Sequence, residues 1–239
     1  MKKVLLAGLV VVSAIAADKN PLKTHAEFGF MDTKGNTNTR AYNLELDAKK
    51  NIEKHSLEFK FDGQYGESDG VKNKNKFATT LDYNYQFMNT LAFTYFIGYK
   101  DDEFSGFDYQ IATGPGVKWQ AYKSDKQSVA LDASILYAYD KFDCSPSCVT
   151  KDDDYAAGRA KLTYELQVLE NLKFNQDLSY RTDLSDMDNY FVYSKSALSS
   201  KISDIFSAGL SYKVDYVNMP PSGKTYTDRT LTANLILDY

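Results

Sequence analysis

The chain has 239 residues, a net charge of −4 and two cysteines. The excess of acidic residues argues against nucleic acid as a partner, because nucleic-acid binding rewards clustered positive charge. The 19 Tyr and 14 Phe beside a single Trp are a strong aromatic bias, and such residues suit strands and membrane interfaces.

The first residues have the pattern of a secretory leader. A short basic region, Met1-Lys2-Lys3, precedes an apolar run over 4–12, and small residues follow up to Ala17. The run is shorter than the about 20 apolar residues that a spanning helix needs. We therefore expect a cleaved signal peptide over 1–17 and a single domain over 18–239.

The rest of the chain repeats an alternation of period two. In one example, Leu57, Phe59 and Phe61 alternate with Glu58 and Lys60. Successive side chains of a strand point to opposite faces, so each such segment has one apolar and one wet face. Twelve strands are expected, at about 24–33, 37–50, 53–66, 75–88, 90–100, 106–121, 127–140, 154–168, 171–182, 189–200, 204–217 and 226–239.

An apolar face on nearly every strand is typical of a barrel with lipid outside and water inside. The pattern predicts an all-β fold, a transmembrane antiparallel up-and-down β-barrel of about 12 strands in the Gram-negative outer membrane. Short connections at 87–90 and 169–171 fit periplasmic turns, and longer ones at 67–74, 141–153 and 218–225 fit outer loops. The segment around Lys195 is the weak one, because its serines do not sort by face.

One strand is interrupted by Gly114-Pro115-Gly116. Proline cannot donate a hydrogen bond to a sheet, so we expect a bulge or kink there.

Charged side chains on the inward face must contact water or pair with one another, because exposure to lipid costs several kcal/mol. One interpretation is a water-filled conduit with a modest preference for cations, since acids outnumber bases on this face. The other is a closed network of ion pairs that fills the interior. The candidate interior-lining residues at mid-depth are Glu45, Lys60, Asp82, Asp108, Asp132, Lys161 and Asp177.

The longest outer loop holds both cysteines, in Cys144-Ser-Pro-Ser-Cys148. In an oxidising compartment we expect Cys144 and Cys148 to form a small disulfide at the loop tip. The alternatives are a metal-binding pair with neighbouring aspartates, and a free dithiol. We expect no metal site, because the acidic outer loops lack calcium-loop spacing.

Three short motifs resemble those of the salt-induced outer-membrane protein family (YdiY-like). They are Gly35-Asn-Thr-Asn-Thr39, the stretch Tyr99–Asp108, and Gly114-Pro-Gly116. The chain departs from the family at Gln110, where other members tend to have arginine. The resemblance implies an outer-membrane barrel and a place in salt or osmotic adaptation, and it implies no established activity.

Catalysis finds little support in the sequence. Neither histidine, His25 or His55, lies at the outer edge of a strand beside a serine motif, and no G-x-S-x-G is present. We expect no enzyme activity and no cofactor. The expected partners are the lipid bilayer, lipopolysaccharide, and the outer-membrane assembly machinery, which would engage the C-terminal strand ending in Tyr239.

Two functions remain open at this point. The first is a narrow polar conduit for small solutes or ions. The second is a non-conducting structural or adhesion barrel, with an interior sealed by ion pairs and outer loops that bind glycolipid or a partner. The number of subunits is left open.

Overall fold

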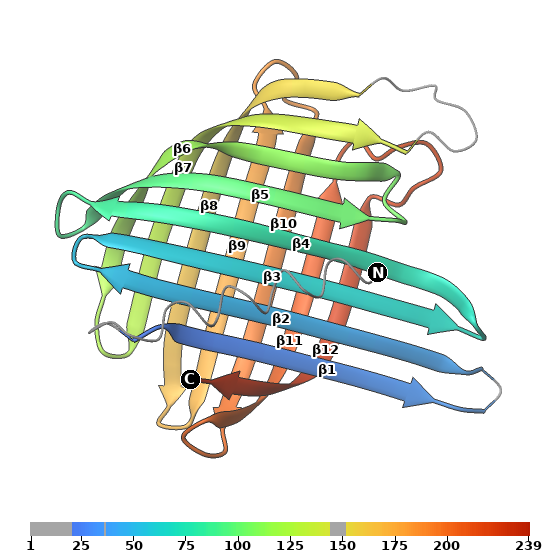
Figure 1. The fold of residues 1–239 in the computed structure, drawn as a ribbon, viewed down its shortest axis with the longest axis horizontal. Helices are drawn as coiled ribbons and strands as arrows, with labels where there is room; N and C mark the ends of the chain where they lie inside the picture. The colour runs from blue at the N-terminus through green and yellow to red at the C-terminus, as the bar shows by residue number, and fades with distance from the viewer. Residues whose placement is uncertain (1–20, 36, 144–151) are drawn as a thin grey trace.

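A computed structural model describes residues 21–35, 37–143 and 152–239 (Figure 1). The expected leader over 1–17 lies outside these residues. No helix among them is long and apolar enough to cross a membrane. The described strands are β1 (Lys23–Thr33), β2 (Thr39–Ile52), β3 (His55–Ser68), β4 (Val71–Gln86), β5 (Leu91–Asp102), β6 (Phe107–Lys123), β7 (Gln127–Phe142), β8 (Asp153–Leu169), β9 (Leu172–Asp183), β10 (Tyr190–Lys201), β11 (Phe206–Val217) and β12 (Thr227–Asp238).

The strands form a closed antiparallel barrel in which each strand pairs with its sequence neighbours and β1 pairs with β12. The predicted twelve-stranded up-and-down barrel is therefore confirmed. In Figure 1 the front strands cross the back strands at a steep angle, and the chain ends where β1 begins. Both ends of the barrel sequence lie on the side of the short turns, which we call the inner end; the opposite side is the outer end.

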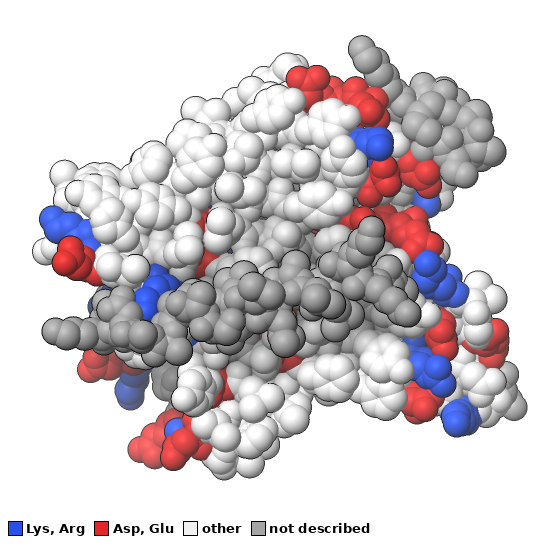
Figure 2. All heavy atoms as spheres, viewed as in Figure 1, with Lys and Arg blue, Asp and Glu red and all other residues white. Residues whose placement is uncertain are grey.

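Matching faces of neighbouring strands keep apolar groups outward and charges inward. In the register of β2 and β3, Leu46 lies opposite Phe61, and Glu45 lies opposite Asp62. On the face seen in Figure 2, charged side chains gather at the two ends of the strands and leave a largely uncharged wall between them. A hydrocarbon layer fits such a wall.

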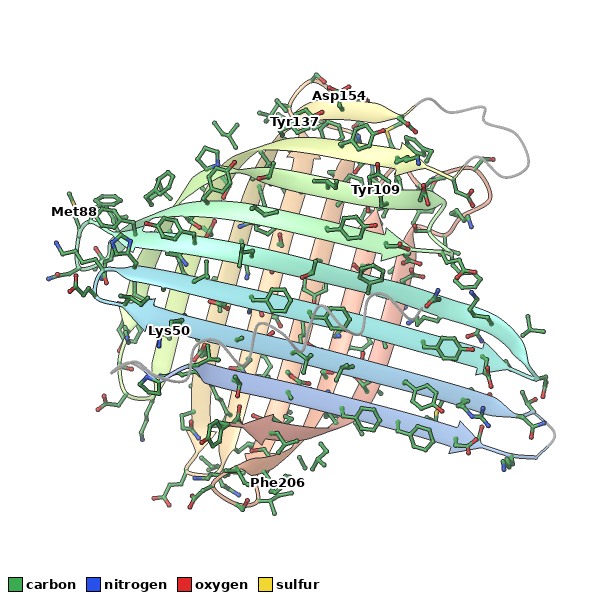
Figure 3. All side chains as sticks on the ribbon, viewed as in Figure 1. Lys50, Met88, Tyr109, Tyr137, Asp154 and Phe206 are labelled. Atoms are coloured by element: carbon green, nitrogen blue, oxygen red, sulfur yellow. The ribbon has the colours of Figure 1, made fainter. Side chains whose placement is uncertain are left out.

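Aromatic rings lie along the outward face of the strands (Figure 3), and several of them stack near the outer end. The Tyr99 ring stacks on Phe77 at 5.7 Å and on Tyr109 at 5.8 Å. On the far wall, Tyr190 lies 5.5 Å from Tyr180 and 5.8 Å from Tyr216. Rings at this height are typical of the interfacial girdle of membrane barrels.

The expected long outer loop at 67–74 is wrong. β3 continues to Ser68 and β4 begins at Val71, so only Asp69-Gly70 connects them. Both residues have positive φ, 49° at Asp69 and 78° at Gly70. An Asp-Gly pair in this conformation makes a tight hairpin turn whose twist matches that of the flanking strands. The other polar residues of 67–74, which were expected in a loop, therefore belong to the strands.

The expected bulge at Gly114–Gly116 is also wrong. Thr113 pairs with Tyr137 and Gly116 with Ser134, so the register between β6 and β7 is the same on both sides of the proline. The two glycines instead allow the backbone of β6 to lie very close to that of β7. A Cβ atom on Gly114 would lie 2.3 Å from the backbone oxygen of Ile135, and one on Gly116 would lie 2.5 Å from that of Ala133.

We expect Gly114→Ala to lower the free energy of unfolding by about 2 kcal/mol, because a methyl group must push two backbones apart. Urea unfolding in detergent micelles, followed by Trp119 fluorescence, measures the change. Gly35→Ala is the matched control, since nothing lies within 4 Å of the Cβ position of Gly35. Equal stabilities of the two variants would contradict this account.

Strand β10 failed to alternate clearly because polar side chains on its outward face bond to one another. Gln176 on β9 donates to the Ser194 hydroxyl at 3.0 Å and accepts from Ser196. The group satisfies its own hydrogen bonds, which reduces the cost of facing lipid. Lys195, between the serines, therefore points inward.

Candidate functional site

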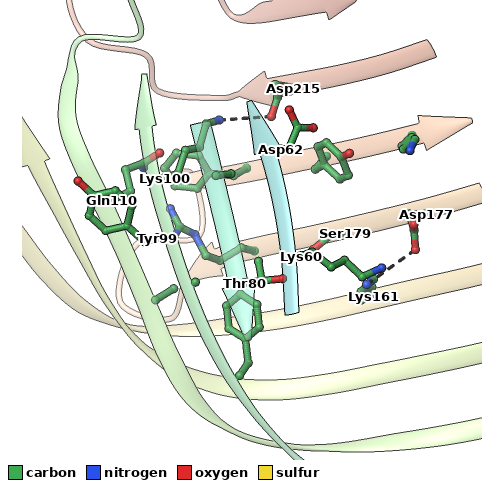
Figure 4. Close-up of a pocket in the computed structure, with 18 of the residues that line it drawn as sticks. Lys60, Asp62, Thr80, Tyr99, Lys100, Gln110, Lys161, Asp177, Ser179 and Asp215 are labelled. Atoms are coloured by element: carbon green, nitrogen blue, oxygen red, sulfur yellow. Dashed lines mark hydrogen bonds and ion pairs between the residues drawn. The ribbon is translucent and has the colours of Figure 1, made fainter. Parts of the chain in front are cut away.

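The lumen of the barrel holds two cavities. The larger, of about 1140 Å³, opens among the inner turns and is lined there by residues such as Lys126 and Tyr239. The smaller, of about 350 Å³, lies toward the outer end and is lined by residues such as Gln110, Arg181 and Val217 (Figure 4). Together they occupy most of the depth of the barrel.

Side chains that line both cavities form the boundary between them, which we call the waist. They come from six different strands, three are acids and three are lysines: Asp47, Lys60, Asp82, Lys161, Asp177 and Lys195. Two pairs within this group are long, with 3.9 Å from Lys60 Nζ to Asp47 and 3.8 Å from Lys161 Nζ to Asp177. Such loose, partly exposed pairs leave their charges available to water and solutes. Lys60 and Lys195 also have close partners outside the group, at 3.0 Å or less.

Six of the seven predicted lining residues face these cavities. Glu45, Lys60, Asp82, Lys161 and Asp177 line the smaller cavity, and Asp132 lines the larger one. These six side chains lie at the lumen cavities, and their role in selectivity stays a prediction.

The prediction that Asp108 lines the interior is wrong. The register of β6 against β7 shifts between Phe107 and Tyr109, so the alternation does not carry through this bulge. The carboxylate of Asp108 pairs at 2.9 Å with Lys141 at the outer rim and is 52% exposed. The lysine also lies over the outward-facing Tyr109 ring, 5.3 Å from its centroid. Asp108 therefore belongs to the rim and not to the lumen.

Tight ion pairs close one side of the lumen, around β12. We call this group the seam cluster; it consists of Glu27, Glu45, Asp62, Lys195 and Lys213. Lys195 lies 2.9 Å from Glu27 and 2.7 Å from Glu45, and Lys213 contacts both Glu45 and Asp62. The side chain of Lys213 is only 2% exposed. Lys195 belongs to both the waist and this cluster. The pairs of the cluster are shorter and more buried than the Lys60–Asp47 and Lys161–Asp177 pairs of the waist.

A second group of ion pairs crosses the lumen. Asp215 on β11 lies 2.8 Å from Lys76 on β4 and 3.3 Å from Lys100 on β5 (Figure 4). β5 and β11 are six places apart around the closed sheet, which puts them on opposite walls. Because two side chains bridge these walls, the lumen is narrow at this height.

The wall formed by β5 to β10 carries arginines stacked on aromatic rings. The Arg159 guanidinium lies 3.8 Å from the Phe96 centroid and 3.3 Å from Asp132. That of Arg181 lies 4.2 Å from the Phe191 centroid and 3.4 Å from Asp140. Stacking and pairing hold both cations against the wall.

The outer mouth is partly covered by connections from opposite sides. A Cβ atom on Gly106, in the β5–β6 connection, would lie 2.8 Å from Pro221, in the β11–β12 connection. Nearby, hydrogen bonds from Lys72 and Asn75 hold the pKa of the Glu103 carboxyl below its ordinary value. The cysteine pair Cys144 and Cys148, proposed for the longest outer loop, lies outside the described residues.

The family model described as "Protein of unknown function, DUF481" matches residues 26–239. The chain belongs to the DUF481 family. This confirms the resemblance to an uncharacterised outer-membrane family that the short motifs indicated. No curated protein matches the chain at a significant level.

Solved structures similar to this DUF481 barrel are outer-membrane porins and translocators. The NanC porin is 8% identical, with a TM-score of 0.50 over 92% of this chain and 99% of that chain. The KdgM porin is 11% identical (TM-score 0.44; 92% and 98% covered). The translocator domain of the autotransporter NalP from Neisseria meningitidis is 10% identical (TM-score 0.47; 98% and 94% covered). At such identities the likeness to NanC supports the fold alone.

Three lumen lysines of the DUF481 barrel were missed by the sequence analysis. Lys76 was placed at the very start of a strand, Lys100 at the end of one, and Lys195 on the strand that did not alternate. The neighbours of Lys195 carried a usable signal, because Tyr190, Val192 and Leu198 share the opposite parity. These three lysines line the smaller cavity and offset part of the acidic excess predicted for the inward face.

Proposed function

We propose that this protein is a narrow outer-membrane conduit for small polar solutes or ions. The observation that carries the proposal is the waist, where charges of both signs, joined by two long ion pairs, line two adjoining water-accessible cavities. Twelve strands enclose a lumen between that of filled eight-stranded barrels and that of open sixteen-stranded porins. A role in salt or osmotic adaptation is compatible with such a conduit.

We expect the conduit to prefer cations more weakly than the sequence alone predicts. Three of the six waist residues are lysines, so a cation meets repulsion as well as attraction on its way through. Asp82 is the waist acid most available to a permeating cation, because no described residue bonds to its carboxylate or pairs with it within 4 Å. We propose that Asp82 accounts for the preference that remains.

Asp82→Asn should lower the cation-to-anion permeability ratio by about twofold, since charged rings of a pore set its selectivity. The reversal potential of single barrels in a planar bilayer under a KCl gradient measures this ratio. Asp108→Asn is the matched control, because it removes the same charge from the outer rim. If Asp82→Asn leaves the reversal potential unchanged, Asp82 is not a selectivity determinant.

The second candidate function is a non-conducting barrel, sealed by ion pairs, whose outer loops bind glycolipid or a partner. The Lys100–Asp215 pair across the lumen and the Gly106–Pro221 contact at the mouth favour it. Conductance decides between the two functions. Unitary currents over a range of salt concentrations support the conduit, whereas their absence in folded, inserted protein supports the sealed barrel.

We further propose that the protein acts without catalysis. Both histidines are held in contacts that suit a structural role: His25 bonds to Glu27 and Asp238, and His55 bonds to the Tyr83 hydroxyl. The proposed surroundings are the Gram-negative outer membrane with its lipopolysaccharide. The strand that ends near Tyr239 is proposed to engage the assembly machinery.

A further inference from the structure

Two oppositely charged groups at the waist have no hydrogen bond to any described residue. The Asp82 carboxylate also has no cation within 4 Å among these residues. The Lys161 ammonium lies 3.8 Å from the Asp177 carboxylate, which is too long for a hydrogen bond. Asp82 and Lys161 each line both cavities, and the Lys161 side chain is 27% exposed. Water and solutes in the lumen can therefore reach both groups.

The other four waist charges are engaged more closely by the protein. Lys60 lies 3.0 Å from Glu58, and Lys195 belongs to the seam cluster. Asp177 accepts a hydrogen bond from a threonine hydroxyl at 2.9 Å, and Asp47 keeps its 3.9 Å contact with Lys60. One carboxylate and one ammonium, those of β4 and β8, are thus the charges of the waist that a solute can engage with the least competition.

The neighbours of these two groups do not neutralise them. β4 and β8 are four places apart around the closed sheet, and the two charges form no ion pair with each other. Asp82 lies opposite Glu58 in the register of β3 and β4, and like charges in that position repel each other. Lys161 lies opposite Asp132, whose carboxylate is paired with Arg159 at 3.3 Å. A cation beside Asp82 and an anion beside Lys161 would both be stabilised.

A hydroxyl group accompanies each of the two charges. Ser179 lies opposite Lys161 in the register of β8 and β9, and Figure 4 shows both at the cavity wall. Thr80 precedes Asp82 by two residues and shares its inward face. Both hydroxyls line the smaller cavity, and neither bonds to a described residue. An ammonium with a hydroxyl suits a carboxylate, and a carboxylate with a hydroxyl oxygen suits an ammonium.

Such a pair of charges does not match a simple ion. A cation that approaches Asp82 is repelled by Lys161, and an anion that approaches Lys161 is repelled by Asp82. A solute that carries one charge of each sign is attracted at both of its ends. The arrangement therefore favours zwitterions over ions of either sign.

We propose that the waist binds small zwitterions that carry one carboxylate and one ammonium, as free amino acids do. The carboxylate of the solute contacts Lys161 and Ser179, and its ammonium contacts Asp82 and Thr80. The smaller cavity, of about 350 Å³, has room for a solute of this size. The inference rests on the proposed function, because it names the class of solute for the same conduit.

Binding is tested by saturation-transfer NMR on the purified protein in detergent micelles. Glycine is compared with glycolamide, an uncharged molecule made of the same atoms. We expect at least about a threefold stronger signal from glycine, because it forms charge-assisted hydrogen bonds at both ends. Acetate and methylammonium, which each carry one of the two charges, should give signals close to that of glycolamide. A glycine signal no stronger than that of glycolamide, or no stronger than that of methylammonium, would overturn the proposal.

Substitution of the lysine assigns the site. Lys161→Gln should reduce the glycine signal to the level of glycolamide. Lys173→Gln is the matched control, since Lys173 lines only the larger cavity and is paired with Glu165 at 3.0 Å. A glycine signal that persists in folded Lys161→Gln would refute the site. The comparison of solutes on the unaltered protein needs no variant, so it decides the question even where Lys161→Gln does not fold.

Swelling of proteoliposomes in isosmotic glycine or glycolamide separates this inference from the conduit itself. Glycine should enter at least about twofold faster, although a charged solute normally loses more on leaving bulk water for a narrow lumen. Preferential binding of glycine without entry of either solute would remove the conduit and leave the binding site in place. Equal entry of the two solutes, without preferential binding, would leave the conduit in place and overturn the zwitterion site.

Discussion

Shortening the β11–β12 connection should raise the unitary conductance at least about twofold, because a constriction at the mouth limits flow through the wider cavities behind it. The change replaces Met219–Lys224 by Asn-Gly, which removes Pro221 from its position against Gly106. A two-residue Asn-Gly turn is a favoured hairpin connection, so β11 and β12 should keep their pairing. Planar-bilayer recordings of single insertions measure the effect.

Ser222→Ala is the control for this experiment, since it keeps the length of the connection and alters only an exposed side chain. An unchanged conductance in the shortened variant would move the limiting constriction away from the mouth, to the waist or to the Lys100–Asp215 bridge. Absence of current in both proteins would favour the sealed barrel.

Lys213→Met should destabilise the barrel by about 3–5 kcal/mol, because it removes a buried cation shared by two carboxylates and leaves Asp62 without its ion-pair partner. Lys213 contacts Glu45 and Asp62, and its side chain is 2% exposed. These pairs hold β11 to β2 and β3 across both β12 and β1. Urea unfolding in vesicles or micelles measures the loss.

Lys173→Met is the matched control. Lys173 is paired with Glu165 at 3.0 Å, but both side chains are more than 40% exposed. Exposed pairs contribute about 0–1 kcal/mol, so this variant should stay close to the parent. Adding Glu45→Gln and Asp62→Asn to Lys213→Met should recover part of the stability. Equal losses at the two lysines would show that burial of the seam cluster does not matter.

The sequence predicted the barrel well because the alternation is a local signal with a strict physical cause. A side chain such as Asp82 or Lys161 on the charged face of a clean strand must point into water, so its placement follows from parity. The strand ends were less accurate where polar residues continued a strand, as they do beside Asp69-Gly70. There the turn chemistry, and not the polarity, marks the end of the element.

The remaining errors concern features that the alternation of side chains along a strand does not determine. A bulge next to Asp108 moved that carboxylate to the rim. The pairing of Lys100 with Asp215 depends on which walls come close, and alternation says nothing about the cross-section of the barrel. The backbone pairing of β1 with β12 runs only from His25 opposite Asp238 to Phe28 opposite Leu235, although both strands are longer. The length of this pairing is also a long-range property, because each strand alone alternates normally.

The junction at the inner end also bears on the order of assembly. Thr24 and Tyr239 exchange backbone hydrogen bonds in both directions, across 215 residues of sequence. The hairpin of β1 and β2 can form while later segments are still unpaired, yet the barrel cannot close until β12 is in place beside β1. Loop closure over so long a span is costly and slow. Until then, one edge of β1 has no pairing partner. Unpaired strand edges can pair with other chains, so this edge is where the incomplete sheet is most prone to aggregate.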